Sequence, residues 1–203
     1  AGIEVATGDY IGFVDSDDYV SQNFYELLLG VCTFDDCFAC SHFVRVDEVG
    51  NIRNRKDPRL DSHIIPPVDF ARDLMLHIGD VSVWSKLFPA KVIGTTRFRE
   101  GVLNEDLLFM LDILPKVSKI AFTGKVGYYY LCRANSISSK YGKSIEDMVL
   151  NSIEVRDRLI LLYPVITQEC NRFVLFQHMA YLLLVPKDLR TRNNTLYSNA
   201  KSY

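Results

Sequence analysis

Three carboxylates stand close together near the start of the chain, in the stretch GFVDSDDYV at residues 12–20. Asp15, Asp17 and Asp18 directly follow an apolar run at residues 10–14, which we interpret as a buried strand. Carboxylates this close repel one another unless a cation, a metal-bound phosphate or open water relieves the repulsion. The stretch therefore predicts either a divalent-metal site or a solvated turn.

A second pair of acids, Glu105 and Asp106, follows Asn104 at the start of a helix-like segment over residues 104–114. Asn104 is the expected N-cap, and acids in the first turn of a helix are stabilised by its dipole. The residues alone favour this structural role for the pair.

Other chemistries fit the first acidic cluster less well. An EF-hand calcium loop fails, because Tyr19 and Val20 stand where a ligand and the obligatory glycine are required. A phosphatase of the haloacid dehalogenase type also carries Asp-x-Asp after a strand, but Tyr19 replaces the Thr or Val of that pattern, so it is a poor runner-up. Cys37 and Cys40 form a CxxC pair with no second pair at zinc-finger spacing, and we expect the five cysteines to be reduced thiols.

The elements that must position these acids alternate between strands and helices. Helical spacing predicts helices over residues 21–29, 68–77, 104–114, 143–163 and 166–185, and strands are predicted over residues 38–46 and 119–131, the latter as a strand pair broken at Thr123-Gly124. Ser21 is a candidate N-cap, and residues 190–203 are expected to be frayed or loosely docked. This order of elements indicates an α/β protein.

The composition limits the classes of partner. A chain of 203 residues, 48% of them hydrophobic, can bury a core, and a formal net charge of -2 provides no basic field for nucleic acid, so we expect no nucleic-acid partner. The most apolar segment, residues 173–185, is too short to span a bilayer and is expected to be a buried helix. No secretion signal is recognisable, which predicts a cytoplasmic protein. Residues 1–6 resemble the middle of a helix without a start signal, so we expect the chain to begin inside a domain.

In its wider context, ATGDYIGFVDSDD at residues 6–18, the acidic cluster closely resembles the central segment of family 2 glycosyltransferases. Three further segments resemble the same family in the same order: SVWSKLF at residues 82–88, GVLNEDLLF at residues 101–109 and YYYLCRANSIS at residues 128–138. The resemblance implies a GT-A fold, a Rossmann-like and mostly parallel sheet flanked by helices, with the donor site at the strand ends. This domain would cover residues 1–142, and residues 143–203 would form a helical extension.

On the donor side, the resemblance implies that Mn²⁺ or Mg²⁺ is held against the diphosphate of a nucleotide sugar. Asp17 would be the direct metal ligand, and Asp15 would lie on the ribose or metal side. Ser16 and Arg133 would add donor contacts, the arginine because its planar fork suits a phosphate. We expect a UDP-sugar as the donor.

On the acceptor side, the resemblance implies that Asp106, beside Glu105, deprotonates the hydroxyl group of a saccharide or lipid-linked acceptor. Trp84 would stack on a sugar face, although a lone tryptophan is more often part of a core, and Lys86 and Glu105 would help to shape the acceptor site. The reaction would be inverting and would serve polysaccharide biosynthesis in a bacterium. A peripheral contact with the inner face of the membrane and a homodimer are further expectations.

The family pattern is incomplete in this sequence. Family members begin with a strand of the Ile-Pro-x-Tyr-Asn kind and carry a later Asp-Gly-Ser-x-Asp segment, and neither is present here. We therefore expect a fragment that is truncated at its N-terminus, lacks about half of a donor pocket and is weakly active or inactive. The alternatives are a non-catalytic remnant that binds a partner or itself through an exposed sheet edge, and the Asp-x-Asp phosphatase.

Overall fold

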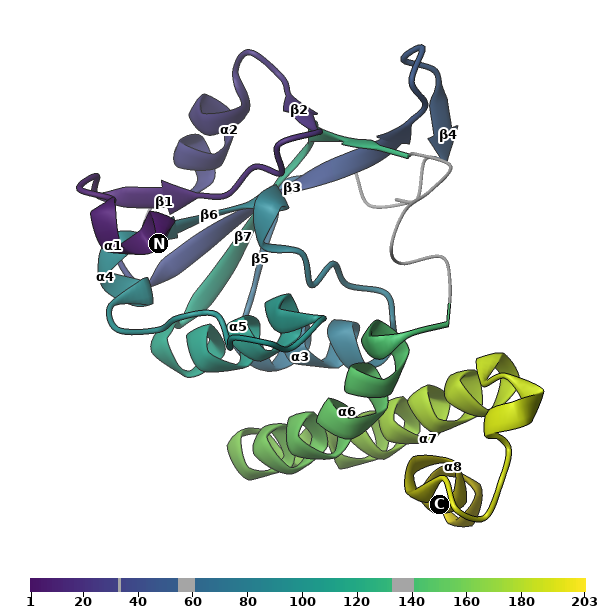
Figure 1. The fold of residues 1–203 in the computed structure, drawn as a ribbon. Coiled ribbons are helices and arrows are strands. Elements are labelled where there is room, and N and C mark those ends of the chain that lie inside the picture. The colour runs from purple at the N-terminus through teal and green to yellow at the C-terminus, as the bar shows by residue number, and fades with distance from the viewer. Residues whose placement is uncertain (33, 55–60, 133–140) are drawn as a thin grey trace.

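The structure, a computed structural model, describes residues 1–203 except residues 33, 55–60 and 133–140. The described strands form one curled sheet in the order β1-β6-β3-β7-β2, with β4 beside β3 and β5 beside β7 (Figure 1). Their bounds are β1 Tyr10–Gly12, β2 Tyr19–Val20, β3 Cys37–Val46, β4 Ile52–Asn54, β5 His63–Ile65, β6 Lys86–Pro89 and β7 Lys119–Leu131.

Helices cover both faces of this sheet. They are α1 Gly2–Val5, α2 Phe24–Val31, α3 Pro67–Met75, α4 Ala90–Ile93, α5 Glu105–Ile113, α6 Lys143–Leu162, α7 Thr167–Leu184 and α8 Thr195–Ser202, with 3₁₀ turns η1 Val83–Ser85, η2 Leu114–Lys116, η4 Pro164–Ile166 and η5 Lys187–Leu189. α2 lies on one face and α3 and α5 lie on the other, while α6 and α7 form a further layer beyond α3 and α5 (Figure 1). The predicted α/β class is confirmed.

The two long strands β3 and β7 form the centre of the sheet and run parallel. Their pairing extends from Cys37 opposite Lys119 to Val46 opposite Leu131, and the other five pairings of described strands are antiparallel. A parallel pair needs a long crossover connection, which α3, α4 and α5 supply between β3 and β7. The sheet is therefore mixed, which corrects the mostly parallel sheet that was predicted.

β7 is one continuous strand, where a strand pair was predicted to break at Thr123-Gly124. Gly124 has a φ of +64°, and the register against β3 shifts between Cys40 and His42. Glycine adopts this conformation at little steric cost, so the chain forms a bulge instead of a turn. Both halves of β7 consequently stay paired with β3.

The α6–α7 hairpin is built into the main hydrophobic core. Val155 and Leu159 of α6 and Phe173 of α7 are buried in the same cluster as the apolar side of α5. Arg99, before α5, donates to both carboxylate oxygens of Glu154 at 2.8 and 2.7 Å. The predicted helical extension thus shares the core of the sheet domain.

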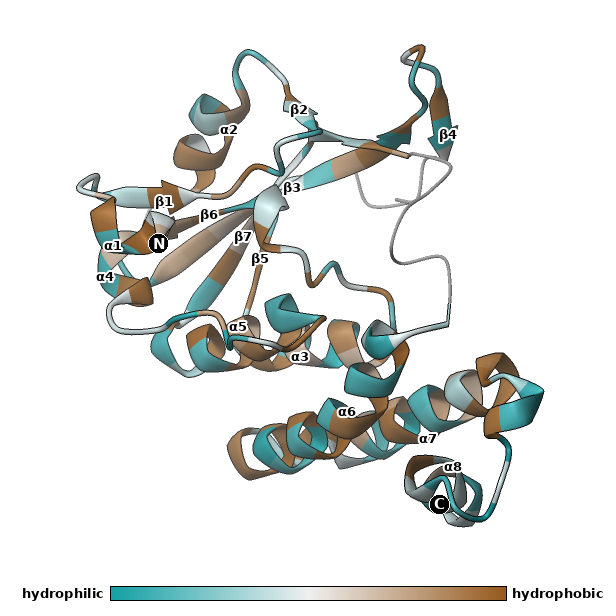
Figure 2. Ribbon diagram, in the orientation of Figure 1, coloured by the Kyte–Doolittle hydropathy of each residue, from teal (hydrophilic) through white to brown (hydrophobic). Residues whose placement is uncertain are grey.

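Only one side of α7 is buried, where a buried helix was predicted over residues 173–185. The polar residues Gln177 and His178 lie on the buried side, whereas the exposed fraction of Leu183 is 77%. Apolar stretches alternate with polar ones along α6 and α7 (Figure 2). Within the described residues, we find no helix with the length and apolar composition that a membrane span needs.

The C-terminal segment is docked, which corrects the expectation of a frayed tail. α8 buries Ala200 in a cluster with Tyr181 of α7 and with Val185, the residue that follows this helix. Tyr203 stacks on His178 with ring centroids 4.4 Å apart. These contacts depend on one small residue and one terminal ring, which helical periodicity does not reveal.

Of the two predicted N-caps, Asn104 is confirmed in its position and Ser21 is not. Asn23, not Ser21, occupies the cap position of α2, and Ser21 Oγ donates to Asn23 Oδ1 at 3.1 Å. Asn104 does occupy the cap position of α5, with a φ of +66°, but its amide donates to Ser144 O of α6 at 2.7 Å. A tertiary contact has therefore replaced the local capping bond.

Candidate active site

The acidic turn, residues 15–18, follows β1 at the edge of the described sheet. Ile11 and Phe13 pack against the core, whereas Tyr10 and Val14 have exposed fractions of 37% and 45%. The run that was predicted to be a buried strand is therefore half-exposed, because β6 is its partner on one side only. The carboxylates that follow it consequently emerge at the surface.

A tyrosine of β7 fixes the acidic turn. Tyr128 Oη accepts from the backbone N of Asp15 at 3.1 Å and donates to Asp18 Oδ2 at 2.8 Å. Leu131 N donates to Asp18 Oδ1 at 2.7 Å. Burial, followed by the hydrogen bond to Asp18, raises the pKa of Tyr128, which keeps its hydroxyl protonated as a donor. Asp18 thus anchors the turn, while Asp15 and Asp17 are exposed.

The two acidic motifs influence each other electrostatically. Partial desolvation of its carboxyl group raises the pKa of Asp15, and the charges of Asp18, Asp17 and Glu105 raise it further. Glu105 lies in the first turn of helix α5. The fold therefore brings the start of α5 close to the acidic turn, although the two segments are far apart in the sequence. A concentration of like charges of this kind is relieved by a cation.

Asp106 is the half-buried acid of the site. Its Oδ2 accepts a hydrogen bond from Val83 N at 3.2 Å. Burial raises the pKa of Asp106 to about 6, and the charges of Glu105 and Asp15 add to this, against the hydrogen bond from Val83. A carboxylate that titrates near neutral pH is suited to accept a proton from a substrate hydroxyl group and to release it again.

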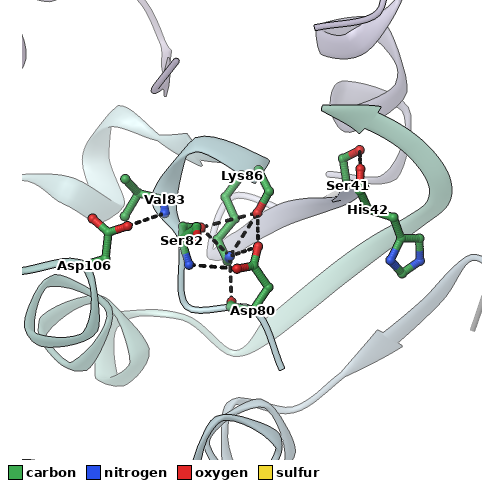
Figure 3. A network of polar contacts seen from close by, with 8 residues as sticks. Ser41, His42, Asp80, Ser82, Val83, Lys86 and Asp106 are labelled. Carbon is green, nitrogen blue, oxygen red and sulfur yellow. Dashed lines mark hydrogen bonds and ion pairs between the residues drawn. The ribbon is translucent and has the colours of Figure 1, made fainter. Parts of the chain in front are cut away.

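A buried lysine fixes the loop that carries Val83 (Figure 3). Lys86, with an exposed fraction of 1%, donates from Nζ to Asp80 O at 2.8 Å and to Ser82 O at 2.6 Å. Its Nζ also lies 3.4 Å from Asp80 Oδ2, which accepts from Ser85 Oγ at 2.5 Å. Sequence reasoning missed Asp80, whose only signal was its position shortly before the tryptophan segment.

Trp84 and Lys86 lie behind the site, not on its surface. Trp84 has an exposed fraction of 8%, stacks on Tyr128 with ring centroids 4.2 Å apart, and meets Phe43 edge-on at 4.8 Å. Stacking on a sugar needs an open ring face, and the Lys86 ammonium group makes its hydrogen bonds within its own loop. These side chains support Tyr128 and the loop of Val83. The burial of Trp84 argues against its predicted stacking on a sugar, and the predicted role of Lys86 at the acceptor site stays a prediction.

A cavity of about 530 Å³ opens beside Asp106. Ser82, Glu105 and Asp106 line one part of it, and Met148 of α6 and Phe173 of α7 line another. The helical hairpin therefore contributes a wall of the cavity that contains the candidate base. Sequence reasoning assigned no functional role to this wall.

The acidic turn fits a divalent cation as part of a shared set of ligands. Within the described ranges, no group of three or more His, Cys, Asp or Glu side chains is placed to hold a metal ion, and all five cysteines are free thiols. Mg²⁺ is commonly held by one or two carboxylates together with substrate phosphates, a set to which Asp15 and Asp17 could contribute. Of the other predicted donor contacts, Ser16 is exposed in the turn, and Arg133 lies outside the described residues.

Known proteins of similar sequence support a common family. The sequence model described as Glycosyl transferase family 2 matches residues 1–93. The chain is 24% identical over 149 residues to the cholesterol galactosyltransferase of Borreliella burgdorferi, an alignment that covers 68% of this chain and 42% of that protein. It is 22% identical over 167 residues to the glycosyltransferase GlyA of Streptococcus pneumoniae, with 78% and 24% covered. The chain thus spans less than half the length of these curated relatives.

A solved structure shares the fold. The crystal structure of S. aureus TarS 1-349 in complex with UDP-GlcNAc matches 98% of this chain and 57% of that chain, with a TM-score of 0.66 and 18% identity. The match confirms the predicted GT-A type of α/β fold. The motifs, the fold and the match of the family model to residues 1–93 thus agree in their similarity to glycosyltransferase family 2.

Proposed function

We propose that this chain carries the catalytic machinery of an enzyme that transfers a sugar from a nucleotide-diphosphate sugar to an acceptor hydroxyl group. The observation that carries the proposal is the proximity of two acidic sites in different surroundings. The exposed acidic turn lies close enough to Glu105 for their charges to interact, and Asp106, the next residue, lines a cavity. The names of the relatives support sugar transfer, and the UDP-GlcNAc in the TarS complex supports a UDP-sugar as the donor.

On the donor side, Asp17 and Asp15 would hold Mn²⁺ or Mg²⁺ against the diphosphate. When bound, such a cation neutralises the charge that develops on the departing nucleotide. Tyr128 and Asp18 would keep the turn in place through the hydrogen bonds at 3.1 and 2.8 Å. The exposed position of the turn suits this task, because its carboxylates lose little hydration when they meet a cation.

On the acceptor side, Asp106 would act as the general base. The acceptor hydroxyl would pass its proton to the Asp106 carboxylate while its oxygen forms a bond to the anomeric carbon of the sugar. The bond from that carbon to the nucleotide would break, and its electron pair would leave with the diphosphate. Attack from the face opposite the nucleotide would invert the anomeric centre. Val83 N would hold one carboxylate oxygen through the bond at 3.2 Å, which leaves the other for the proton.

The acceptor would be a saccharide or a lipid-linked saccharide. Met148 and Phe173 add apolar groups to a cavity that polar side chains also line, and sugars present both hydroxyl groups and apolar C–H faces. We also propose that the protein contacts a membrane surface peripherally and that it forms a homodimer.

The test of this function is product analysis with UDP-glucose, UDP-galactose and UDP-GlcNAc, in the presence of Mn²⁺ and with excess EDTA. We expect release of UDP from at least one donor, faster with a carbohydrate acceptor than with water alone and suppressed by EDTA. Release of inorganic phosphate in place of UDP would favour the phosphatase alternative. Folded protein that turns over no donor would contradict the proposal.

A further inference from the structure

Two cavities share part of their lining at His77. The first contains Asp106, and a second cavity of about 260 Å³ lies between β3, β5 and α3. His77 and Gly79 line both of them. Figure 3 shows Asp106, from the first cavity, and His42, from the second, on opposite sides of the polar network around Lys86. A ligand that occupied both cavities would therefore contact the segment around His77.

His77 has a backbone conformation that histidine rarely adopts. Its φ is +58°, and it directly follows Leu76, the C-cap of α3, at a position where glycine is usual. Ile78 N closes the helix end by donating to Asp73 O at 2.9 Å. A side chain in this conformation costs free energy, and such residues are concentrated at functional sites.

The imidazole ring of His77 is held by α7 at the cavity wall. It stacks on Phe173 with ring centroids 5.4 Å apart and lies 4.3 Å from the ring of Phe176. Its Nε2 lies 3.1 Å from Nε2 of Gln177, which is a donor, so the imidazole Nε2 accepts and the ring is neutral. Burial, followed by the charge of Arg172, lowers the pKa of His77 and favours the same neutral form. His77 and Gln177 thus place an imidazole and an amide group in the lining of the first cavity.

The second cavity combines polar groups with aromatic rings. Arg45 of β3 and His63 of β5 line it with groups that can form hydrogen bonds. Phe122 of β7 forms part of its floor, and His63 stacks on this ring with centroids 4.6 Å apart and an angle of 4° between the planes. Polar groups around an aromatic surface suit the hydroxyl groups and the C–H face of a sugar. The volume is below the range of pockets for drug-sized ligands and suits a single sugar unit.

We infer that the two cavities form one acceptor site for a carbohydrate of at least two linked units. The reacting unit lies beside Asp106 in the first cavity, the neighbouring unit lies against Arg45 and His63 in the second, and the linkage crosses His77. The inference rests on the proposed transfer and narrows its acceptor class, because a single sugar would occupy only the first cavity. His77 is then a specificity-determining residue that binds the acceptor at the linkage.

The test compares one-unit and two-unit acceptors in a single assay of UDP release. The probes are methyl glycosides of glucose, galactose and N-acetylglucosamine, together with methyl glycosides of their disaccharides. For the unsubstituted chain we expect KM to be about tenfold lower for the two-unit acceptor, the effect of one or two additional hydrogen bonds. His77→Gly and Arg45→Ala should bring the ratio of the two KM values close to one.

The comparison contains its own controls. The ratio of the two KM values is measured within each variant, so a partly unfolded variant still reports it. Arg45 is exposed, so we expect its replacement to disturb the fold little. Lys125→Ala removes an exposed cation of β7 outside both cavities and should keep the tenfold ratio. Equal KM values in the unsubstituted chain, a ratio retained in either His77→Gly or Arg45→Ala, or UDP release to water with no carbohydrate used would overturn the inference. Failure to release UDP at all would instead contradict the proposed transfer, and this inference with it.

Discussion

The two acidic regions of the candidate site carry the same chemical group in different surroundings. Asp15 and Asp17 are exposed after an edge strand, whereas Asp106 is half-buried under Val83 and has its pKa raised to about 6. An exposed carboxylate can exchange water for a cation, and a half-buried one can exchange a proton near neutral pH. Environments that differ in this way commonly mark a division of roles between acids in an active site.

The largest effect is expected when Asp106 is replaced with Asn. The amide cannot accept the acceptor's proton, so the rate of sugar transfer should fall by about 10² to 10⁴-fold. The fold should persist, because the amide oxygen can still accept from Val83 N. Transfer rates at saturating donor, together with thermal unfolding, provide the measurement. Asp112→Asn, on the same helix and ion-paired with Arg158, is the matched control and should keep the rate. A wild-type rate in Asp106→Asn would remove the base assignment.

The dependence of the transfer rate on pH should show the titration of Asp106, which the exposed acids do not share. Asp106 must be ionised to accept a proton, so the transfer rate should fall by about tenfold for each pH unit below about 6. Its pKa is raised above the ordinary value of 3.8, so its contribution to stability is complete below about pH 4 and is lost as the pH rises through 6. The rate and this part of the free energy of unfolding should therefore change in opposite directions. Rate profiles and urea denaturation of the chain and of Asp106→Asn test both trends, and a rate that is flat across this range would contradict them.

Within the acidic turn, Asp18 should matter for stability. Asp18→Ala removes the acceptor of two hydrogen bonds, from Tyr128 Oη and Leu131 N, and should lower the free energy of unfolding by about 1 to 3 kcal/mol. Asp18→Asn keeps one acceptor oxygen and should lose roughly half as much. Urea denaturation measures both variants. An unchanged midpoint in Asp18→Ala would show that the turn does not depend on this anchor.

The smallest effect is expected for Tyr128→Phe. The change removes the hydroxyl bonded to Asp15 N and Asp18 and keeps the stacking on Trp84, so the loss should be about 1 kcal/mol of stability and a several-fold loss of UDP affinity. Tyr129→Phe is the control, because Tyr129 stacks on Tyr19 at 4.8 Å on the neighbouring position of β7. Equal effects in the two variants would mean that the hydroxyl of Tyr128 has no special role.

The sequence revealed the acids more readily than what surrounds them. Helical periodicity located α3, α5, α6 and α7 to within a few residues, and the motifs singled out Asp15, Asp17 and Asp106. The residues that hold these acids in place could not be predicted from periodicity or motifs, because Tyr128 reaches Asp18 only through the pairing of β2 with β7. A Trp-x-Lys pattern likewise does not show whether its side chains contact a sugar or are buried and support their neighbours. For Trp84, the packing of the whole fold determines that the ring is buried.

The contribution of the C-terminal hairpin was also hidden. Periodicity predicted two helices with apolar sides, but it could not tell which neighbour each side would meet. Docking of α7 against α3 places Phe173 and Gln177 beside His77 at the wall of the Asp106 cavity. Long-range packing, which depends on the whole fold, therefore determines what surrounds the candidate base.

The most direct test of the division of roles is calorimetric titration of UDP into the chain with and without Mn²⁺, repeated with Asp17→Ala and with Asp106→Asn. Our account predicts that binding requires Mn²⁺, is lost in Asp17→Ala and is kept in Asp106→Asn, because only the acidic turn meets the diphosphate. Binding that survives in Asp17→Ala, or that is lost equally in both variants, would contradict it.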